Sequence, residues 1–375
     1  MNKHFSLYIH IPFCVSKCNY CDFVSFVCSE EDKRDYFHAL ESEIEHSPYA
    51  GYRTVDTIYI GGGTPSSVDA CDIDRVVNAV QKKFVLAQDC EISMESNPGT
   101  LSEQHCRIYR ECGINRISMG VQAVQPHLLK LLGRTHSFAD VLQSAEWIRN
   151  AGFDNMNLDL MFGLPQQSIA DWIQTLNCSL QLEPEHLSVY SLIVEEGTPF
   201  WGEYADCDFI TDETDRIMYH NACKLLAEKG YGQYEISNFA KKGFPCRHNL
   251  YCWEMEEYVG FGLNASSFAG QTRFSNPSDM QGYIRMANAG GRNNPDGKKM
   301  ASSELESDYI ILGLRKTDGI DLIEFKDVFH EDFMKRYHNV AENLICEGLL
   351  ELKTSRLSLT EKGLDYANCV MREFI

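Results

Sequence analysis

The chain of 375 residues is too long for one ordinary domain, but it suits a barrel of about 200–250 residues with an appended unit. Its 34 basic and 54 acidic residues give a formal net charge of −20, which argues against nucleic acid as a partner because phosphate binding needs clustered lysine and arginine. The sequence lacks a run long enough for a membrane span, the N-terminus lacks the regions of a signal peptide, and the 15 cysteines are an odd number. We therefore expect a cytoplasmic protein whose cysteines stay reduced or bind metal.

Short β-patterned runs alternate with helical runs through the first half of the chain. We expect strands at 6–12, 54–60, 91–97, 116–121, 155–161 and 186–192. Helices are expected between them at 30–46, 70–84, 102–112, 137–150 and 168–181. Six such repeats predict parallel strands joined by helical crossovers.

Three cysteines follow the first expected strand. Cys14, Cys18 and Cys21 stand at C-x3-C-x2-C spacing on one loop. Because [4Fe–4S] clusters normally take four thiolates, three on one loop predict a cluster with one iron left for a substrate or cofactor. The alternatives are an accidental cluster of cysteines and a zinc site completed by His10 or Cys28, although this is not the usual spacing of a zinc knuckle.

The strands alternate apolar and polar side chains, as residues 6–11 and 91–95 show. Parallel strands covered on both faces usually read as continuous apolar runs. An antiparallel sheet with one wet face would also alternate, but hairpins would join its strands. A barrel or part-barrel with a polar lumen explains the pattern, and the side chains expected to point inward are Tyr8, Tyr59, Glu95, Gln122, Asp159 and Tyr190. Buried carboxylates are costly unless they are paired or hydrogen-bonded, so this lumen is predicted to hold a polar ligand.

The turn after the second strand reads GGGTP at 61–65. Glycines there let backbone amides approach a ligand without interference from Cβ atoms, although a plain tight turn is an equally good interpretation. The turn follows a strand, and ligands of α/β barrels gather at the C-terminal strand ends. This position favours the ligand-binding interpretation.

A series of motifs matches one family in order: Tyr8 with IHIPFC, the C-x3-C-x2-C loop, GGGTP, SMESNP, GVQ, LGR, NLDLMFGLP and YSLIVEEGTPF. Together they resemble the radical S-adenosylmethionine (SAM) family of oxygen-independent coproporphyrinogen III oxidases and their heme-chaperone relatives of the HemW type. The resemblance spans nearly the whole chain. It implies an α/β fold, a partial (β/α)6 TIM-like barrel of the radical SAM type.

The resemblance also implies a set of binding residues. Cys14, Cys18 and Cys21 would hold the cluster, and the residues around SAM would be Tyr8, Gly63, Thr64, Glu95, Gln122, Arg134, Asp159 and the backbone near Ile193. The SAM carboxylate suits Arg134, whereas its ammonium and ribose hydroxyls suit Glu95, Gln122 and Asp159. In this family an electron from the cluster cleaves SAM to a 5′-deoxyadenosyl radical, for which a donor such as flavodoxin or ferredoxin would be needed.

Two departures separate this chain from the oxidase branch. The oxidases carry a further cysteine two residues after the third, where this sequence has Phe23, and a longer segment before the first strand. Both departures favour the heme-chaperone branch, whose role is to bind heme and pass it to acceptor proteins. The alternative is an oxygen-independent coproporphyrinogen III oxidase, which performs a radical SAM oxidative decarboxylation in porphyrin biosynthesis, so whether the chain is an enzyme stays open.

Heme binding in the chaperone branch is associated with an H-N-x-x-Y-W motif, which here reads HNLYCW from His248 to Trp253. Histidine can ligate iron and tryptophan can pack on a porphyrin face. Cys252 stands where tyrosine is usual, and Ser266 stands where a histidine is common. The resemblance implies His248 as a heme contact, while an isolated histidine is more often structural.

We expect three units along the chain. Residues 1–235 would form the radical SAM partial barrel, 236–297 the heme-motif segment ending in a linker at 288–297, and 298–375 a small winged-helix-like C-terminal domain. In the last unit, helices are expected at 304–314 and 332–347, followed by a hairpin and a final helix within 349–367. With an acidic chain, a cap over the barrel mouth or an acceptor-docking surface is favoured over a DNA-binding domain. The sequence leaves open whether the protein forms a homodimer.

Overall fold

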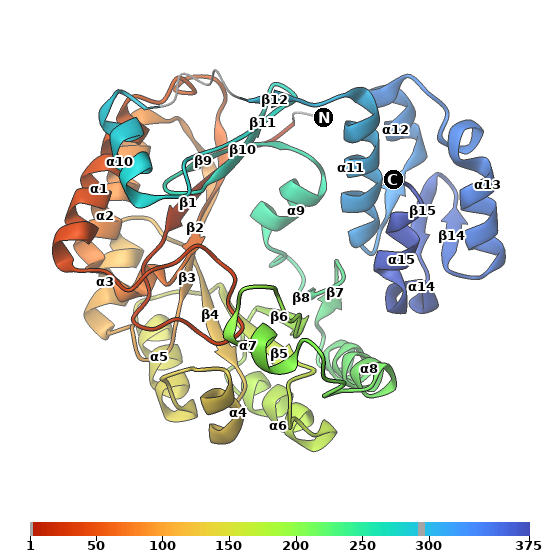
Figure 1. Cartoon of the computed structure of the whole chain (residues 1–375), viewed down its shortest axis with the longest axis horizontal. Helices are drawn as coiled ribbons and strands as arrows, with labels where there is room; N and C mark the ends of the chain where they lie inside the picture. Colours follow the sequence, from red (N-terminus) through yellow and green to blue (C-terminus); the bar gives the residue numbers. More distant parts are fainter. Residues whose placement is uncertain (1–2, 292–296) are drawn as a thin grey trace.

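Six parallel strands in sequence order form the centre of the structure, a computed structural model that describes residues 3–291 and 297–375 (Figure 1). The strands are β1 (Phe5–Ile11), β2 (Val55–Gly62), β3 (Leu86–Ser96), β4 (Arg116–Gln122), β5 (Met156–Phe162) and β6 (His186–Ser191). The helices between them are α1 (Glu30–Glu45), α2 (Ala70–Lys83), α3 (Glu103–Glu111), α4 (Pro126–Leu131), α5 (Phe138–Asn150) and α6 (Ile169–Leu180), with a 3-10 turn at Pro65–Ser67. The six predicted strands and five predicted helices are confirmed, although β3 begins five residues earlier than expected.

Serine side chains fix where several of these helices begin. Ser29, Ser137 and Ser168 each accept a hydrogen bond from the backbone amide three residues later, and the aspartate at that position bonds back to the serine. Such reciprocal caps satisfy amides that have no partner within the helix, and a cap contributes about 0.5–2 kcal/mol. These caps therefore fix the residue at which α1, α5 and α6 begin.

Short strands from later in the chain extend the sheet at both edges to twelve strands. Beside β1 lie β9 (Glu257–Phe261), which runs parallel to it, then β10 (Ser266–Ala269), β11 (Thr272–Ser275) and β12 (Lys298–Lys299). Beside β6 lie β8 (Asn238–Ala240) and β7 (Gly232–Gln233), both in antiparallel pairings. The helices of this part are α7 (Pro199–Tyr204), α8 (Asp212–Glu228), α9 (Arg247–Trp253) and α10 (Met280–Asn288). Of the linker predicted at 288–297, residues 292–296 lie outside the described residues.

The two faces of the barrel strands differ as the alternation predicts. The apolar face packs against the helices in one core that includes Leu7, Ile9, Ile58 and Leu158. The opposite face carries polar side chains that are also buried: Ser6, Thr57, Ser93, Ser118, Asn157 and Ser188. Near the N-terminal ends of the strands these polar groups bond to one another, as the Thr57 hydroxyl donates to the Ser6 hydroxyl at 2.8 Å. Helix α9 packs against β2 and β9. The polar ligand space is thereby restricted to the C-terminal ends of the strands.

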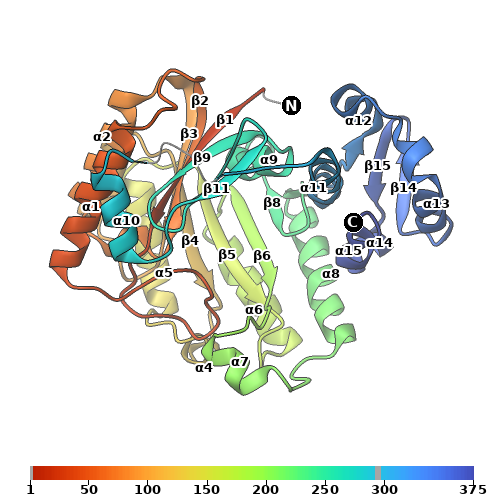
Figure 2. The same ribbon diagram turned by 45° about the horizontal axis from the view of Figure 1, so that its top comes forward.

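The C-terminal unit has its own small sheet (Figure 2), and its core also includes Met255 and Phe268 from the preceding segment. It comprises α11 (Ser302–Arg315), β13 (Ile320–Asp321), α12 (Leu322–Phe329), α13 (Phe333–Cys346), β14 (Leu350–Lys353), β15 (Arg356–Leu359), α14 (Glu361–Asp365) and α15 (Ala367–Arg372). The strand order is β13-β15-β14, and the core is rich in rings such as Phe325 and Phe333. The predicted helices and hairpin are confirmed, whereas the final helix is divided in two at Tyr366.

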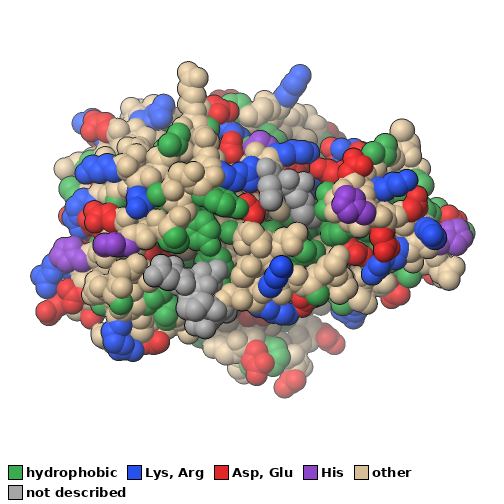
Figure 3. Space-filling model, turned by 90° about the horizontal axis from the view of Figure 1, so that it is seen from above, with side chains coloured by type: hydrophobic (Ala, Val, Ile, Leu, Met, Phe, Trp, Pro, Cys, Tyr) green, Lys and Arg blue, Asp and Glu red, His purple; other side chains and the backbone are tan. Residues whose placement is uncertain are grey.

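Charged side chains of both signs are interspersed over the face seen from above (Figure 3). Through the described part of the chain, every helix is too short or too polar to cross a membrane.

Candidate functional site

Cys14, Cys18 and Cys21 lie on the loop after β1 and line one cavity of about 400 Å³ at the C-terminal ends of the strands. All three are free thiols, and backbone bonds hold the loop in place: the Cys14 amide donates to the Phe26 carbonyl, and the Asn19 amide to the Leu132 carbonyl. Burial raises the pKa of the Cys21 thiol. Within residues 3–291 and 297–375, sets of three His, Cys, Asp or Glu side chains at the spacing of a single bound ion are absent. In a [4Fe–4S] cluster each cysteine thiolate binds a different iron, so the cysteine sulfurs lie farther apart than the ligands of a single ion.

A cationic side chain reaches the cysteine loop from the opposite wall. Arg134, which follows α4, places Nη1 3.6 Å from the Cys18 sulfur and donates from Nη2 to Asn97 Oδ1 at 2.6 Å. Asn97 in turn donates to the Thr64 hydroxyl at 2.9 Å, and that hydroxyl lies 3.5 Å from the Cys14 sulfur. Two of the three thiols are therefore tied through polar side chains to the ends of β2, β3 and β4. A positive charge here suits both thiolates and a carboxylate ligand.

Glu95 projects from β3 into the same cavity. Tyr59 donates its hydroxyl to Glu95 Oε1 at 2.9 Å, and the Gly62 amide donates to Oε2 at 3.1 Å. Burial, followed by the charge of Asp159, raises the pKa of Glu95 to about 7. Gly61 and Gly62 are required here because a Cβ on Gly61 would lie 3.0 Å from the carboxylate, and Gly62 has a φ of +113°. The glycine turn thus admits the carboxylate and directs one amide at it.

Asp159 on β5 is the second carboxyl group of the cavity. Asn157 donates to its Oδ1 at 2.8 Å and Ser118 to its Oδ2 at 3.2 Å, while burial raises the pKa of this group. Gln122, at the end of β4, adds a buried Oε1 that has no hydrogen-bond partner in the described structure. A buried acceptor without a donor is costly, so this atom fits a ligand that donates a hydrogen bond.

The structure brings most of the predicted site residues together. The cavity is lined by the three cysteines and by Gly63, Thr64, Glu95, Gln122, Arg134 and Asp159, together with Tyr59 and Tyr190. Tyr8 lies just outside the lining, with its hydroxyl 3.0 Å from His10 Nδ1. The side chain of Ile193 is 66% exposed and faces a neighbouring cleft. The roles assigned to these residues toward the cluster and SAM stay predictions.

His248 does not line this cavity but lies behind Tyr59, which does. Its Nδ1 is 2.9 Å from the Thr57 hydroxyl, its ring stacks on Tyr59 at 5.1 Å, and burial, followed by the charge of Arg116, lowers its pKa to about 3. Burial also raises the pKa of the neighbouring Cys252 thiol to about 12. The imidazole is therefore neutral and engaged in the barrel wall, and its role as a heme contact stays a prediction.

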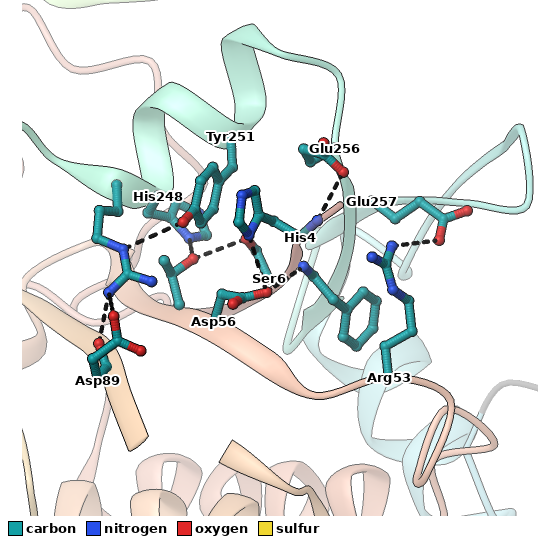
Figure 4. A network of polar contacts seen from close by, with 12 residues as sticks. His4, Ser6, Arg53, Asp56, Asp89, His248, Tyr251, Glu256 and Glu257 are labelled. Carbon is teal, nitrogen blue, oxygen red and sulfur yellow. Dashed lines mark hydrogen bonds and ion pairs between the residues drawn. The ribbon is translucent and has the colours of Figure 1, made fainter. Parts of the chain in front are cut away.

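A polar network anchors α9, the helix that carries His248 (Figure 4). The backbone amides of Arg247 and His248 donate to the buried carboxylate of Glu91. A negative charge at this position is favoured because the N-terminus of a helix carries a partial positive charge. Arg247 also reaches Asp89 at 3.1 Å. At the other side of the helix, the Tyr251 ring stacks on His4 at 4.1 Å between centroids. The helix is thus fastened to β3 and to the start of β1.

Sequence reasoning missed Asn97 and Tyr20 as lining residues and the buried cation Arg116. Asn97 stands two residues after Glu95, at the strand spacing that puts side chains on the same face, so this signal was available. Tyr20 lies between two of the cysteines, where proximity alone predicts a place in the cavity. Arg116 carried no such signal, because its environment of Cys246, Glu91 and Tyr59 comes from distant segments.

Comparisons with known proteins agree with this geometry. Residues 8–178 match the model of the radical SAM superfamily, and residues 306–366 match the HemN C-terminal domain. Among solved structures, the coproporphyrinogen III oxidase HemN of Escherichia coli superposes with a TM-score of 0.84 at 24% identity, covering 100% of this chain and 90% of that one. The fold and the three-cysteine cavity define a radical SAM protein, for which the superfamily implies a [4Fe–4S] cluster and SAM.

Proteins of similar sequence identify the family within this superfamily. The chain is 36% identical to the heme chaperone HemW of Bacillus subtilis over 99% of both chains, and 34% identical to that of Lactococcus lactis over 100% of this chain and 98% of that one. It is 40% identical to the heme chaperone HemW of Escherichia coli over 69% of both. The chain belongs to the HemW family of heme chaperones.

Proposed function

We propose that this protein binds heme and transfers it to acceptor proteins, and that it does so while carrying a [4Fe–4S] cluster with exchangeable SAM. The observation that carries the proposal is the full-length similarity to heme chaperones combined with a cavity in which three loop thiols face two partly buried carboxyl groups and an arginine. The similarity supports heme as the cargo, and the cavity supports the two cofactors.

The residues of the cavity have separate tasks in this proposal. Cys14, Cys18 and Cys21 would hold the cluster and leave one iron for SAM. The reduced cluster would supply the electron that cleaves the sulfonium of SAM. Arg134 binds the SAM carboxylate beside the cluster, since it already lies next to Cys18. Glu95 and Asp159 receive the ammonium and ribose hydroxyls as charge-assisted acceptors, each such bond contributing about 1.5–3 kcal/mol.

Cleavage of SAM would need an electron donor of the flavodoxin or ferredoxin type. Such a donor would approach the cluster across the loop of residues 14–28, where Val15, Phe23 and Val27 are exposed. Phe23 lines the cavity at the position of the oxidases' further cysteine, so we expect chaperone activity without porphyrinogen oxidation. We expect the protein to act in the cytoplasm, and size-exclusion chromatography of the holoprotein decides whether it does so as a homodimer.

The proposal is tested with anaerobically reconstituted protein. Purified wild type should take up heme stoichiometrically in a spectroscopic titration and release it to an apo-acceptor, and it should yield no protoporphyrinogen from coproporphyrinogen, SAM and reductant. Cys18→Ala should lose the iron–sulfur absorbance, whereas Cys71→Ala, an exposed cysteine on α2, should retain it. A wild-type protein that binds no heme refutes the chaperone function.

A further inference from the structure

A second cleft, of about 760 Å³, lies between the barrel and the C-terminal unit. Its walls come from the end of β6, from α8 and from α14 and α15, which stand beside α8 in Figures 1 and 2. Two contacts across it join the units: the Arg216 guanidinium lies 4.8 Å from the Tyr366 ring centroid, and His220 Nε2 lies 3.0 Å from Asp365. Tyr190 lines this cleft and the cluster cavity, so the two spaces share a wall. The volume is within the range of about 300–1,000 Å³ found for pockets that enclose small organic ligands.

We propose that heme lies in this cleft, with its porphyrin between α8 and the α14–α15 segment and its propionates at Arg216 and Arg315. The proposal rests on the proposed chaperone function and assigns the place where the cargo is held. Heme is a flat apolar ring with two anionic arms, so its site needs apolar walls together with cations. The cleft has such walls in Phe162, Val189, Ile210, Ile236 and Leu364, and in the rings of Tyr190, Tyr219 and Tyr366.

Both arginines of the cleft are able to accept an anionic ligand. Arg216 contacts the Tyr366 ring and forms no ion pair within the described residues. Arg315 has a buried Nε without a hydrogen-bond partner there, and its Nη2 forms a long ion pair with Glu235 Oε2 at 3.7 Å. Arginine binds carboxylates strongly through its fork of N–H donors. The two guanidinium groups therefore match two propionates.

Three acidic side chains also lie on the walls, and two of them have partners other than the arginines. Asp215 accepts a hydrogen bond from Ser191 at 2.6 Å, and burial raises its pKa, which favours the neutral acid. Asp365 is paired with His220. Asp212 lies in the exposed first turn of α8, where the helix N-terminus favours its negative charge.

The cleft also gives the HNLYCW segment a role. Trp253, its last residue, packs under Arg315 with the guanidinium 4.5 Å from the ring centroid, and its Nε1 is buried without a partner in the described structure. His248 points the other way, to Thr57. In this arrangement Trp253 is a positioning residue that holds Arg315 at the cleft, and His248 anchors α9 in the barrel.

Heme titration of charge variants tests the cleft. Losing one charge-assisted bond should raise the heme Kd of Arg216→Gln about tenfold or more. Arg110→Gln is the matched control, since Arg110 also lies over an aromatic ring, 5.8 Å from the centroid of Phe153, but on α3. It should bind heme like wild type.

Cysteine labelling gives a readout that needs no substitution. Cys369 is exposed and lines the cleft, and Cys346 is exposed on α13 of the same unit. Bound heme should slow alkylation of Cys369 by N-ethylmaleimide severalfold and leave Cys346 unchanged, as measured by mass spectrometry. If wild type binds heme, but Arg216→Gln binds it equally well and Cys369 is labelled at the same rate, the cleft is wrong and the chaperone function stands. If wild type binds no heme, both are wrong.

Discussion

Replacing Glu95 by glutamine should stabilise the SAM-free protein, and the gain should grow with pH. Burial and the charge of Asp159 raise the pKa of Glu95 from 4.5 to about 7. Because the pKa in the folded state lies above the unfolded value, the contribution of this group to stability is fully present below about pH 4.5 and is lost as pH rises through about 7. A difference of one pKa unit corresponds to about 1.4 kcal/mol. Compared with a group that stays neutral, Glu95 therefore lowers the free energy of unfolding by about 1 kcal/mol at pH 5 and about 3 kcal/mol at pH 8.

Glutamine has the shape of glutamate and no charge, so it removes this cost while it retains a hydrogen-bonding group toward Tyr59 and Gly62. The difference in unfolding free energy between Glu95→Gln and wild type should therefore become about 2 kcal/mol more favourable to the variant between pH 5 and pH 8. Urea unfolding of cluster-free, SAM-free protein followed by circular dichroism at both pH values measures it. Glu196→Gln, on the exposed loop after β6, is the control and should show no pH-dependent gain. A gain for Glu95→Gln that is equal at the two pH values would refute the reasoning.

Three further predictions concern other parts of the molecule. If the ionised form of Glu95 binds SAM, the SAM Kd of reconstituted wild type should rise about tenfold from pH 8 to pH 6, and calorimetry of Glu95→Gln should show a flat profile. Glu235→Ala leaves the Ser237 amide and the Asn238 side chain without their buried acceptor and should cost about 1–3 kcal/mol of stability, whereas removing the more exposed Glu254 should cost less than about 1 kcal/mol in the same urea experiment. Trp172→Ala empties a fully buried site in the main core and should cost about 3–5 kcal/mol, seen as a lower denaturant midpoint.

The elements that follow a local pattern could be predicted from the sequence. Side chains along the barrel strands alternate between apolar and polar, and several crossover helices begin at serines that form caps. Both signals lie within a few residues of one another in the sequence. The three cysteines follow the C-terminal end of β1 and Glu95 lies near the C-terminal end of β3, and a parallel barrel brings such strand ends together. These parts of the site needed no knowledge of distant contacts.

The elements missed by the sequence depend on partners far away in the chain. Strand β9 is five residues long and pairs with β1, about 250 residues earlier, while β7 and β12 have two residues each. Strands that short carry too little pattern to be recognised. The place of His248 was hidden for the same reason, because it depends on Thr57 and on the Glu91 carboxylate that caps α9.

The end of β6 is where the two proposed ligand sites meet. Its parallel partner is β5, but its other neighbour is the three-residue antiparallel strand β8, so the parallel sheet stops there. Helix α8 packs against β5 and β6 on this side, and the C-terminal unit meets it through the contacts of Arg216 with Tyr366 and of His220 with Asp365. Tyr190 stands on the boundary and contributes to both cavities. A ligand that moves this ring in one cavity changes the wall of the other, and by linkage any effect of SAM on heme affinity must be matched by an equal effect of heme on SAM affinity.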